Sequence, residues 1–175
     1  ATGRGVAYLV NRATDTLGLD MNQCTAVVQG YGNVGSIAAL SLARYGAKII
    51  AVSDAHGGIL NRNGFDLFAL DKHVAEKKTV VGFPESEPVT NDQLLLLPCD
   101  ILVPAALENQ ITEDVHVGVA PHSLRAVTPA TFVGNGFPPG PLAQARYFFR
   151  AAASTPQSAL TSIRFGVSAS GSSRL

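Results

Sequence analysis

The stretch over residues 24–54, CTAVVQGYGNVGSIAALSLARYGAKIIAVSD, decides the fold of this chain. It opens with a short apolar, β-branched run at residues 25–28, which is typical of a strand buried on both faces. The next six residues, 30–35, match the spacing G-x-G-x-x-G. A glycine turn directly after a buried strand is the first half of a nucleotide-binding motif.

The second half of the motif follows without a gap. Residues 34–45 carry an apolar helical pattern that ends at Gly46, a residue type favoured just past a helix. Residues 47–53 form another apolar run, and Asp54 stands at its end, 19 residues after Gly35. Strand, glycine turn, helix, strand and acid in this order predict a dinucleotide-binding βαβ unit.

Each residue of the motif has a physical task. Gly30 permits the tight turn, Gly32 lets a pyrophosphate approach the backbone, and Gly35 lets the helix pack closely on the strand. The N–H groups and the positive dipole end of the helix would face the phosphates, with Asn33 as a further donor. Asp54 would accept from a ribose hydroxyl. The alternatives are a glycine-rich turn without a ligand and an aspartate that merely ends a strand.

Composition excludes several classes of function. The net charge is zero and no cluster of lysine or arginine occurs, so neither nucleic acid nor an anionic membrane surface is expected as a partner. No apolar run approaches the roughly 20 residues of a membrane span. Cys24 and Cys99 both lie beside apolar runs and are expected to be buried and reduced. Two isolated cysteines form no metal set, and they favour a reducing compartment such as the cytoplasm.

The chain divides near Asp114 by the distribution of charge. Residues 1–114 hold all 13 acidic residues and 8 basic ones, a net charge of −5, whereas residues 115–175 hold five arginines and no Asp, Glu or Lys. We expect a dinucleotide-binding domain over residues 1–114 and an atypical, irregular tail over residues 115–175. Our hypothesis is that the tail is a frameshift product or an unrelated terminus, and the alternative is an authentic divergent insertion.

The remaining pattern of the first part predicts an α/β fold with a doubly wound, Rossmann-like parallel sheet that is incomplete. Ligands of such sheets bind beyond the carboxyl ends of the strands. The expected elements are a helix over residues 5–17, turns at 57–58 and 61–64, a helix over 66–78, an extended segment at 80–83, a helix capped by Thr90 or Asn91 and running through Leu97, and a strand at 100–103 closed by Pro104.

Four motifs in order carry a resemblance to a known family. They are ATGRGV at residues 1–6, VQGYGNVG at 28–35, SDAHGGI at 53–59 and ILVPAALENQI at 101–111. Residues 1 to about 114 resemble the cofactor-binding domain of the glutamate, leucine, phenylalanine and valine dehydrogenases, and the glutamate branch more than the others.

The resemblance implies oxidative deamination of L-glutamate to 2-oxoglutarate and ammonia, with hydride passing to NAD or NADP. It implies that Thr2 contacts the nicotinamide side of the cofactor, with a plain helix cap as the alternative. It also implies that Ala105 and Asn109 line a ribose pocket, although Asn109 could be only a turn residue. The expected cofactor-binding residues are Thr2, Gly30, Gly32, Asn33, Val34, Gly35, Asp54, Ala105 and Asn109.

No catalytic residue is expected in this chain. In the family the chemistry needs a lysine and an aspartate of a substrate domain, and nothing here matches them, so the chain should be inactive alone. A carboxylate at Asp54 would repel a 2′-phosphate and favours NAD over NADP. Full-length members of the family are homo-oligomers. The alternatives are a non-catalytic nucleotide-binding module and a dehydrogenase of apolar amino acids.

Overall fold

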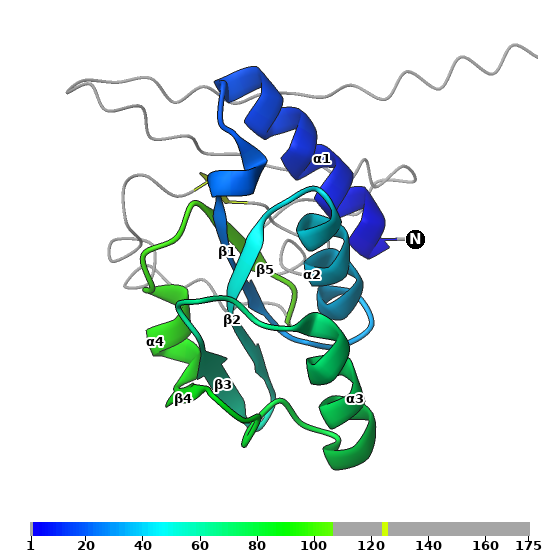
Figure 1. Cartoon of the computed structure of the whole chain (residues 1–175), viewed down its shortest axis with the longest axis vertical. Coiled ribbons are helices and arrows are strands. Elements are labelled where there is room, and N and C mark those ends of the chain that lie inside the picture. Colours follow the sequence, from blue (N-terminus) through cyan, green and yellow to red (C-terminus); the bar gives the residue numbers. More distant parts are fainter. Residues whose placement is uncertain (1, 107–123, 126–175) are drawn as a thin grey trace, which may run out of the picture.

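The predicted βαβ unit forms the centre of the protein. In the computed structural model, which describes residues 2–106 and 124–125, it consists of strand β1 (Thr25–Gln29), helix α2 (Gly35–Arg44) and strand β2 (Lys48–Asp54). Strand β1 pairs in parallel with β2 on one side and with β5 (Ile101–Pro104) on the other. The three strands therefore end at the same edge, as expected for a Rossmann-like sheet (Figure 1).

An antiparallel hairpin extends the sheet and corrects one prediction. Strand β3 (Gly57–Leu60) pairs antiparallel with β2, so the expected turn at residues 57–58 is wrong and the chain turns at residues 55–56 instead. The glycine at 58 serves packing, because a Cβ there would lie 3.0–3.2 Å from Val89, Leu94 and Ser53 side-chain atoms. The glycine at 58 therefore marks a crowded position within a strand and not a turn.

The other edge strand also differs from the prediction. The expected extended segment at 80–83 is a series of bends and turns, and the strand comes later, as β4 (Glu87–Val89), antiparallel to β3. Strand β6 (Leu124–Arg125) pairs in parallel with β5, which completes the order β4-β3-β2-β1-β5-β6 for the described residues. The rest of the predicted tail over residues 115–175, and Asn109, lie outside the described residues.

The predicted helices are all present, but the first begins at Thr2 rather than at residue 5 and the last ends at Leu95 rather than at Leu97. They are α1 (Thr2–Leu17), α2, α3 (Leu67–Lys77) and the short α4 (Asn91–Leu95), with a 3₁₀ turn at Met21–Gln23. Asp66 caps α3 by accepting from the N–H groups of Phe68 and Ala69. Thr90 caps α4 in a capping box with Gln93, so the first of the two predicted caps is the correct one.

Two apolar clusters fix the layers. Helices α1, α2 and α3 bury their apolar sides against one face of the sheet, together with Ala26 and Val28 of β1. Helix α4 packs on the opposite face against Val27 of β1. The alternation along β1 therefore places helices on both faces, the arrangement that a doubly wound sheet requires (Figure 1).

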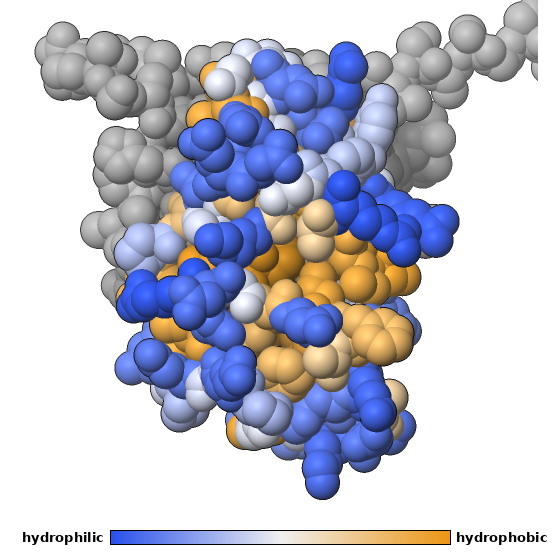
Figure 2. All heavy atoms as spheres, in the orientation of Figure 1, coloured by the Kyte–Doolittle hydropathy of each residue, from blue (hydrophilic) through white to orange (hydrophobic). Residues whose placement is uncertain are grey.

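The outer surface is mostly polar. Figure 2 shows polar side chains above and below an apolar area that lies over α2 and the start of α3. Phe68, on the first turn of α3, is 83% exposed. Among the described residues, no helix is both long enough and apolar enough to cross a bilayer.

Candidate functional site

The site is built around the turn that leaves β1. Gly30 has a φ of 89°, and the N–H groups of Gly30 and Tyr31 donate to the carbonyl oxygen of Ser53 at 3.0 and 2.6 Å. A Cβ on Gly30 would lie 2.7 Å from the nitrogen of Ala106 and 2.8 Å from the carbonyl of Ala105. Both the backbone conformation and the close approach of the segment after β5 therefore require glycine at position 30.

The other two glycines of the motif have different surroundings. A Cβ on Gly35 would overlap the carbonyl oxygen of Gly30, so glycine there serves the contact between helix and turn. Around Gly32 nothing lies within 4 Å of the Cβ position, and its φ is outside the left-handed region. The described residues give no internal reason for glycine at 32. Open space beside a bare backbone is what the close approach of a ligand requires.

The beginning of α2 is suited to an anion. Val34 occupies the N-cap position without any side-chain hydrogen bond, and the first turn contains no acidic residue. The hydroxyl of Ser36 donates to the carbonyl oxygen of Gly32 at 2.7 Å, and the side chain of Asn33 is exposed. The positive end of the helix dipole is thus free of a carboxylate from its own first turn, and phosphate groups bind at such helix ends.

Thr2 lies near this turn although it is far away in sequence. Its neighbour Gly3 packs so closely on α2 that a Cβ would lie 2.5 Å from the carbonyl oxygen of Val34 and 2.9 Å from the nitrogen of Ala38. The first turns of α1 and α2 are therefore in contact, and Thr2 is exposed at the first position of α1. The N-terminal ends of two helices meet at the predicted site.

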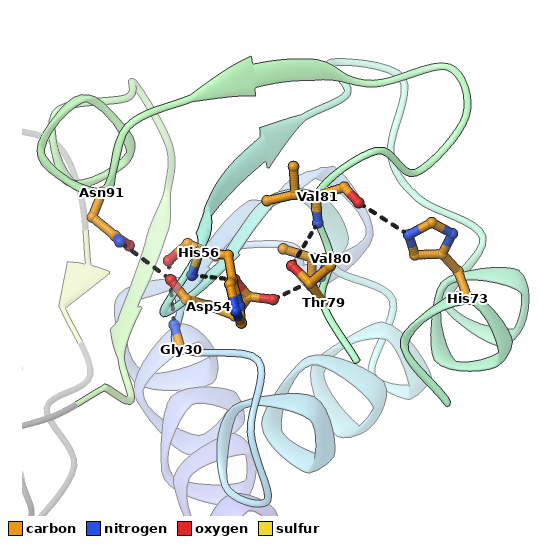
Figure 3. A network of polar contacts seen from close by, with 9 residues as sticks. Gly30, Asp54, His56, His73, Thr79, Val80, Val81 and Asn91 are labelled. Atoms are coloured by element: carbon orange, nitrogen blue, oxygen red, sulfur yellow. Dashed lines mark hydrogen bonds and ion pairs between the residues drawn. The ribbon is translucent and has the colours of Figure 1, made fainter. Parts of the chain in front are cut away.

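Asp54 ends β2 at the same edge of the sheet, and its carboxylate is held by donors of its own chain. One oxygen, Oδ1, accepts from the N–H of His56 at 2.8 Å, and Oδ2 accepts from the N–H of Val80 at 2.7 Å. The side chain of Thr79 also hydrogen-bonds the carboxylate. Figure 3 shows the contacts of Asp54 with His56 and Val80. The amide of Asn91 donates to the backbone oxygen of Asp54 at 3.2 Å. Asp54 therefore joins the end of β2 to the segment after α3 and to α4.

These contacts keep Asp54 ionised. Burial alone would raise the pKa of Asp54, but the hydrogen bonds from Thr79, Val80 and His56 outweigh it and hold the pKa below its ordinary value of 3.8. The Asp54 side chain is 18% exposed, and the imidazole of His56, 68% exposed, lies 3.6 Å from it. A carboxylate has about four acceptor positions, so two backbone donors and the Thr79 side chain still leave it able to accept from a ribose hydroxyl.

The structure brings most of the predicted site residues together at one edge of the sheet. Ala105 lies against Gly30, and its N–H donates to the carbonyl oxygen of Gln29 at 2.7 Å. Sequence reasoning missed Ser53, Thr79 and Val80, which hold the turn and the acid in place. Thr79 and Val80 come 25 and 26 residues after Asp54. No local sequence pattern predicts their hydrogen bonds to the Asp54 carboxylate.

The described residues hold no cluster of three or more His, Cys, Asp or Glu side chains that could bind a metal. Neither cysteine forms a disulfide with another described residue. Cys24 is buried as expected, whereas Cys99 is only half-buried. Burial, together with the charges of Asp100 and Asp20, raises the pKa of the Cys24 thiol, which makes it a packing residue rather than a nucleophile.

Comparisons with known proteins agree with this geometry. The sequence profile of the glutamate/leucine/phenylalanine/valine dehydrogenases matches residues 1–124. A glutamate dehydrogenase of Thermotoga maritima is 51% identical over 112 residues, which cover 63% of this chain and 27% of that protein. An NADP-specific glutamate dehydrogenase of Halobacterium salinarum is 42% identical over 116 residues, covering 66% of this chain and 28% of that protein. A cryptic catabolic NAD-specific glutamate dehydrogenase of Bacillus subtilis is 42% identical over 115 residues, covering 65% of this chain and 26% of that protein.

Solved structures give the same result. The glutamate dehydrogenase of Peptoniphilus asaccharolyticus superposes with a TM-score of 0.55 at 32% identity, over 75% of this chain and 30% of that one. A hetero-hexameric glutamate dehydrogenase of Thermus thermophilus, solved with leucine bound, superposes with a TM-score of 0.62 at 25% identity. The superposition covers 74% of this chain and 32% of that one. The chain spans between a quarter and a third of the length of these relatives.

Proposed function

The chain belongs to the glutamate/leucine/phenylalanine/valine dehydrogenase family, and on that basis we propose that residues 1–114 are the NAD(P)-binding part of a glutamate dehydrogenase. The full-length enzyme would convert L-glutamate and water to 2-oxoglutarate and ammonia, with NAD(P)⁺ as the hydride acceptor. The observation that carries the proposal is the open space at Gly32, beside the uncapped first turn of α2.

This chain's contribution is to bind and orient the cofactor. The N–H groups of Gly32, Val34 and Gly35 would hold the pyrophosphate, and Asn33 would add a side-chain donor. Gly30, whose own N–H is bonded to Ser53, would contribute by forming the tight turn. Asp54 would accept from the adenosine ribose, and Thr2 would approach the nicotinamide side. Ala105, which packs on Gly30, and Asn109 would line the ribose pocket.

The preferred cofactor is NAD, and NADP remains an acceptable ligand. The pKa of Asp54 lies below 3.8, so its carboxylate is charged at neutral pH and repels a 2′-phosphate. Relatives of both specificities are similar to this chain. The exposed imidazole of His56 beside Asp54 offsets part of the repulsion when it is protonated.

Glutamate is preferred as substrate over an apolar amino acid because the relatives with the highest identities named above are glutamate dehydrogenases. The full-length protein would be an oligomer by analogy with the hetero-hexameric Thermus relative, and we propose that its subunits are identical. Two cysteines that form no disulfide among the described residues fit a reducing compartment, and we place the protein in the cytoplasm.

The domain division near Asp114 is part of the same proposal. The absence of Asp, Glu and Lys from residues 115–175 supports a tail translated out of frame. Translating the underlying nucleotide sequence in all three frames tests this. A family-like continuation in another frame is expected, and its absence from both other frames would contradict the frameshift.

Titration of the 175-residue chain with NADH, followed by nicotinamide fluorescence and by competition with NAD⁺ and NADP⁺, tests the cofactor assignment. We expect weak, saturable binding, with NAD⁺ the better competitor. Failure of both nucleotides to compete would overturn the assignment. Glutamate-dependent reduction of NAD⁺ should not occur, because acid–base help and substrate positioning by other residues are needed. Turnover by purified chain would contradict the assignment of catalysis to another domain.

A further inference from the structure

Tyr31, between the first two glycines of the turn, is anchored to two separate elements. Its N–H donates to the carbonyl oxygen of Ser53 on β2, and its phenol donates to Oδ1 of Asp71 on α3 at 2.8 Å. The Tyr31 side chain is only 6% exposed and belongs to the main apolar cluster. The turn between Gly30 and Gly32 is therefore tied to α3 by one side chain.

The hydrogen bond between Tyr31 and Asp71 keeps one direction at neutral pH. Burial, and then the hydrogen bond and negative charge of Asp71, raise the pKa of the Tyr31 phenol well above its ordinary value of 10.0. The phenol therefore keeps its proton and donates, and the carboxylate of Asp71 accepts. A hydrogen bond to an ionised partner is stronger than one between neutral groups.

Fixing this turn matters for binding because glycine has wide conformational freedom. The turn contains Gly30 and Gly32, and its free form would sample many backbone conformations without an anchor. Ordering those conformations when a ligand arrives would cost affinity, so a turn that is held beforehand binds more tightly. Tyr31 and Asp71 supply that preorganisation.

The segment that follows α3 holds the other end of the site. Val80 donates to Asp54 and Thr79 hydrogen-bonds it, close to Gly30 (Figure 3). Asp71 on α3 holds the turn through Tyr31. The turn and the acid are thus tied to α3 and to the residues directly after it.

We propose that Asp71 is a positioning residue for the pyrophosphate turn and acts through the phenol of Tyr31. This inference rests on the proposed function, since it assumes that the turn binds a dinucleotide. Asp71 itself does not touch the ligand. It sets where the backbone N–H groups of the turn lie.

The test compares Tyr31→Phe, Asp71→Ala and the double variant in the 175-residue chain, with ADP-ribose and adenosine as probes. Tyr31→Phe keeps the buried ring and removes only the donor. Each single variant should bind ADP-ribose about tenfold more weakly. The double variant should be no weaker than either single one, because both remove the same interaction. The affinity for adenosine, which lacks the pyrophosphate, should change less than twofold in every variant.

The control is Glu76→Gln, which removes an exposed carboxylate from the same helix and should leave both affinities unchanged. Parental affinity for ADP-ribose in both single variants would overturn the inference while leaving the proposed function intact. Equal losses for adenosine and ADP-ribose, or additive losses in the double variant, would also overturn it. If the parent chain binds no ADP-ribose, the proposed function fails first and the inference falls with it.

Discussion

Gly35, the first residue of α2, lies directly against the carbonyl oxygen of Gly30, so closely that a Cβ at position 35 would overlap that oxygen. The contact joins the two ends of the glycine turn at residues 30–35. It also places the first turn of α2 on Val28 of β1, whose Cγ1 would lie 3.3 Å from the same Cβ.

We therefore predict that Gly35→Ala destabilises the protein by about 1–3 kcal/mol, because backbone must move to admit the methyl group. The matched variant is Gly32→Ala, whose Cβ would meet nothing within 4 Å. It should change the free energy of unfolding by less than about 0.5 kcal/mol. Urea unfolding curves of the two variants measure the difference, and equal stability would contradict the close contact.

Asp54 should make stability depend on pH. Its pKa in the folded protein is below 3.8, so it stabilises the fold above that ordinary value and loses the contribution as pH falls through the lower, folded pKa. Asp54→Asn should therefore be less stable than the parent at pH 7, and the gap should narrow below about pH 4.

The control for this comparison is Asp15→Asn, which changes an exposed carboxyl on α1. Denaturant unfolding between pH 7 and pH 3 measures the free energy of unfolding of the parent and of the two variants. A gap between parent and Asp54→Asn that stays constant over this range would show that the carboxylate charge is not what stabilises the loop at 79–80.

Lys78 is a place where the chain can be stabilised. It ends α3 in the left-handed conformation, with φ 63° and ψ 15°. A residue with a Cβ pays roughly 1–2 kcal/mol for this conformation, and glycine avoids that cost at the expense of roughly 0.5–1 kcal/mol of entropy. We predict that Lys78→Gly raises the free energy of unfolding by about 0.5–1 kcal/mol.

The same change inside the helix should have the opposite sign. Ala75→Gly, at an exposed position of α3, should lower stability by about 1 kcal/mol. Thermal unfolding of both variants checks the pair. Destabilisation by Lys78→Gly would mean that the lysine side chain makes a contribution larger than its backbone strain.

The elements predicted from sequence were those with strong local patterns. Strands β1 and β2 and helices α2 and α3 end within a residue or two of the expected positions, because apolar runs, caps and the Gly46 stop signal act over a few residues. The hairpin at β3 was missed because Gly57 and Gly58 carry the same signal as a turn. The packing role of Gly58 became visible only in the structure, where Leu94 and Val89 lie against it.

The contacts that hold the candidate site in place could not be predicted from local sequence patterns. Tyr31 meets Asp71 across 40 residues, and Val80 meets Asp54 across 26. Neither pair shows a spacing or periodicity that marks it in the sequence. The motif predicts which residues would face a dinucleotide, whereas the tertiary packing of α3 determines which residues hold the turn and Asp54 in place.

The most direct test of the account is a calorimetric titration of NAD into the parent chain and into Gly32→Ala and Gly32→Val. If the bare backbone at position 32 admits the pyrophosphate, affinity should fall stepwise with side-chain bulk, by about tenfold or more for valine. The urea midpoint of Gly32→Ala should stay near that of the parent. Equal NAD affinity in all three proteins would contradict the assignment of the glycine turn as the cofactor site.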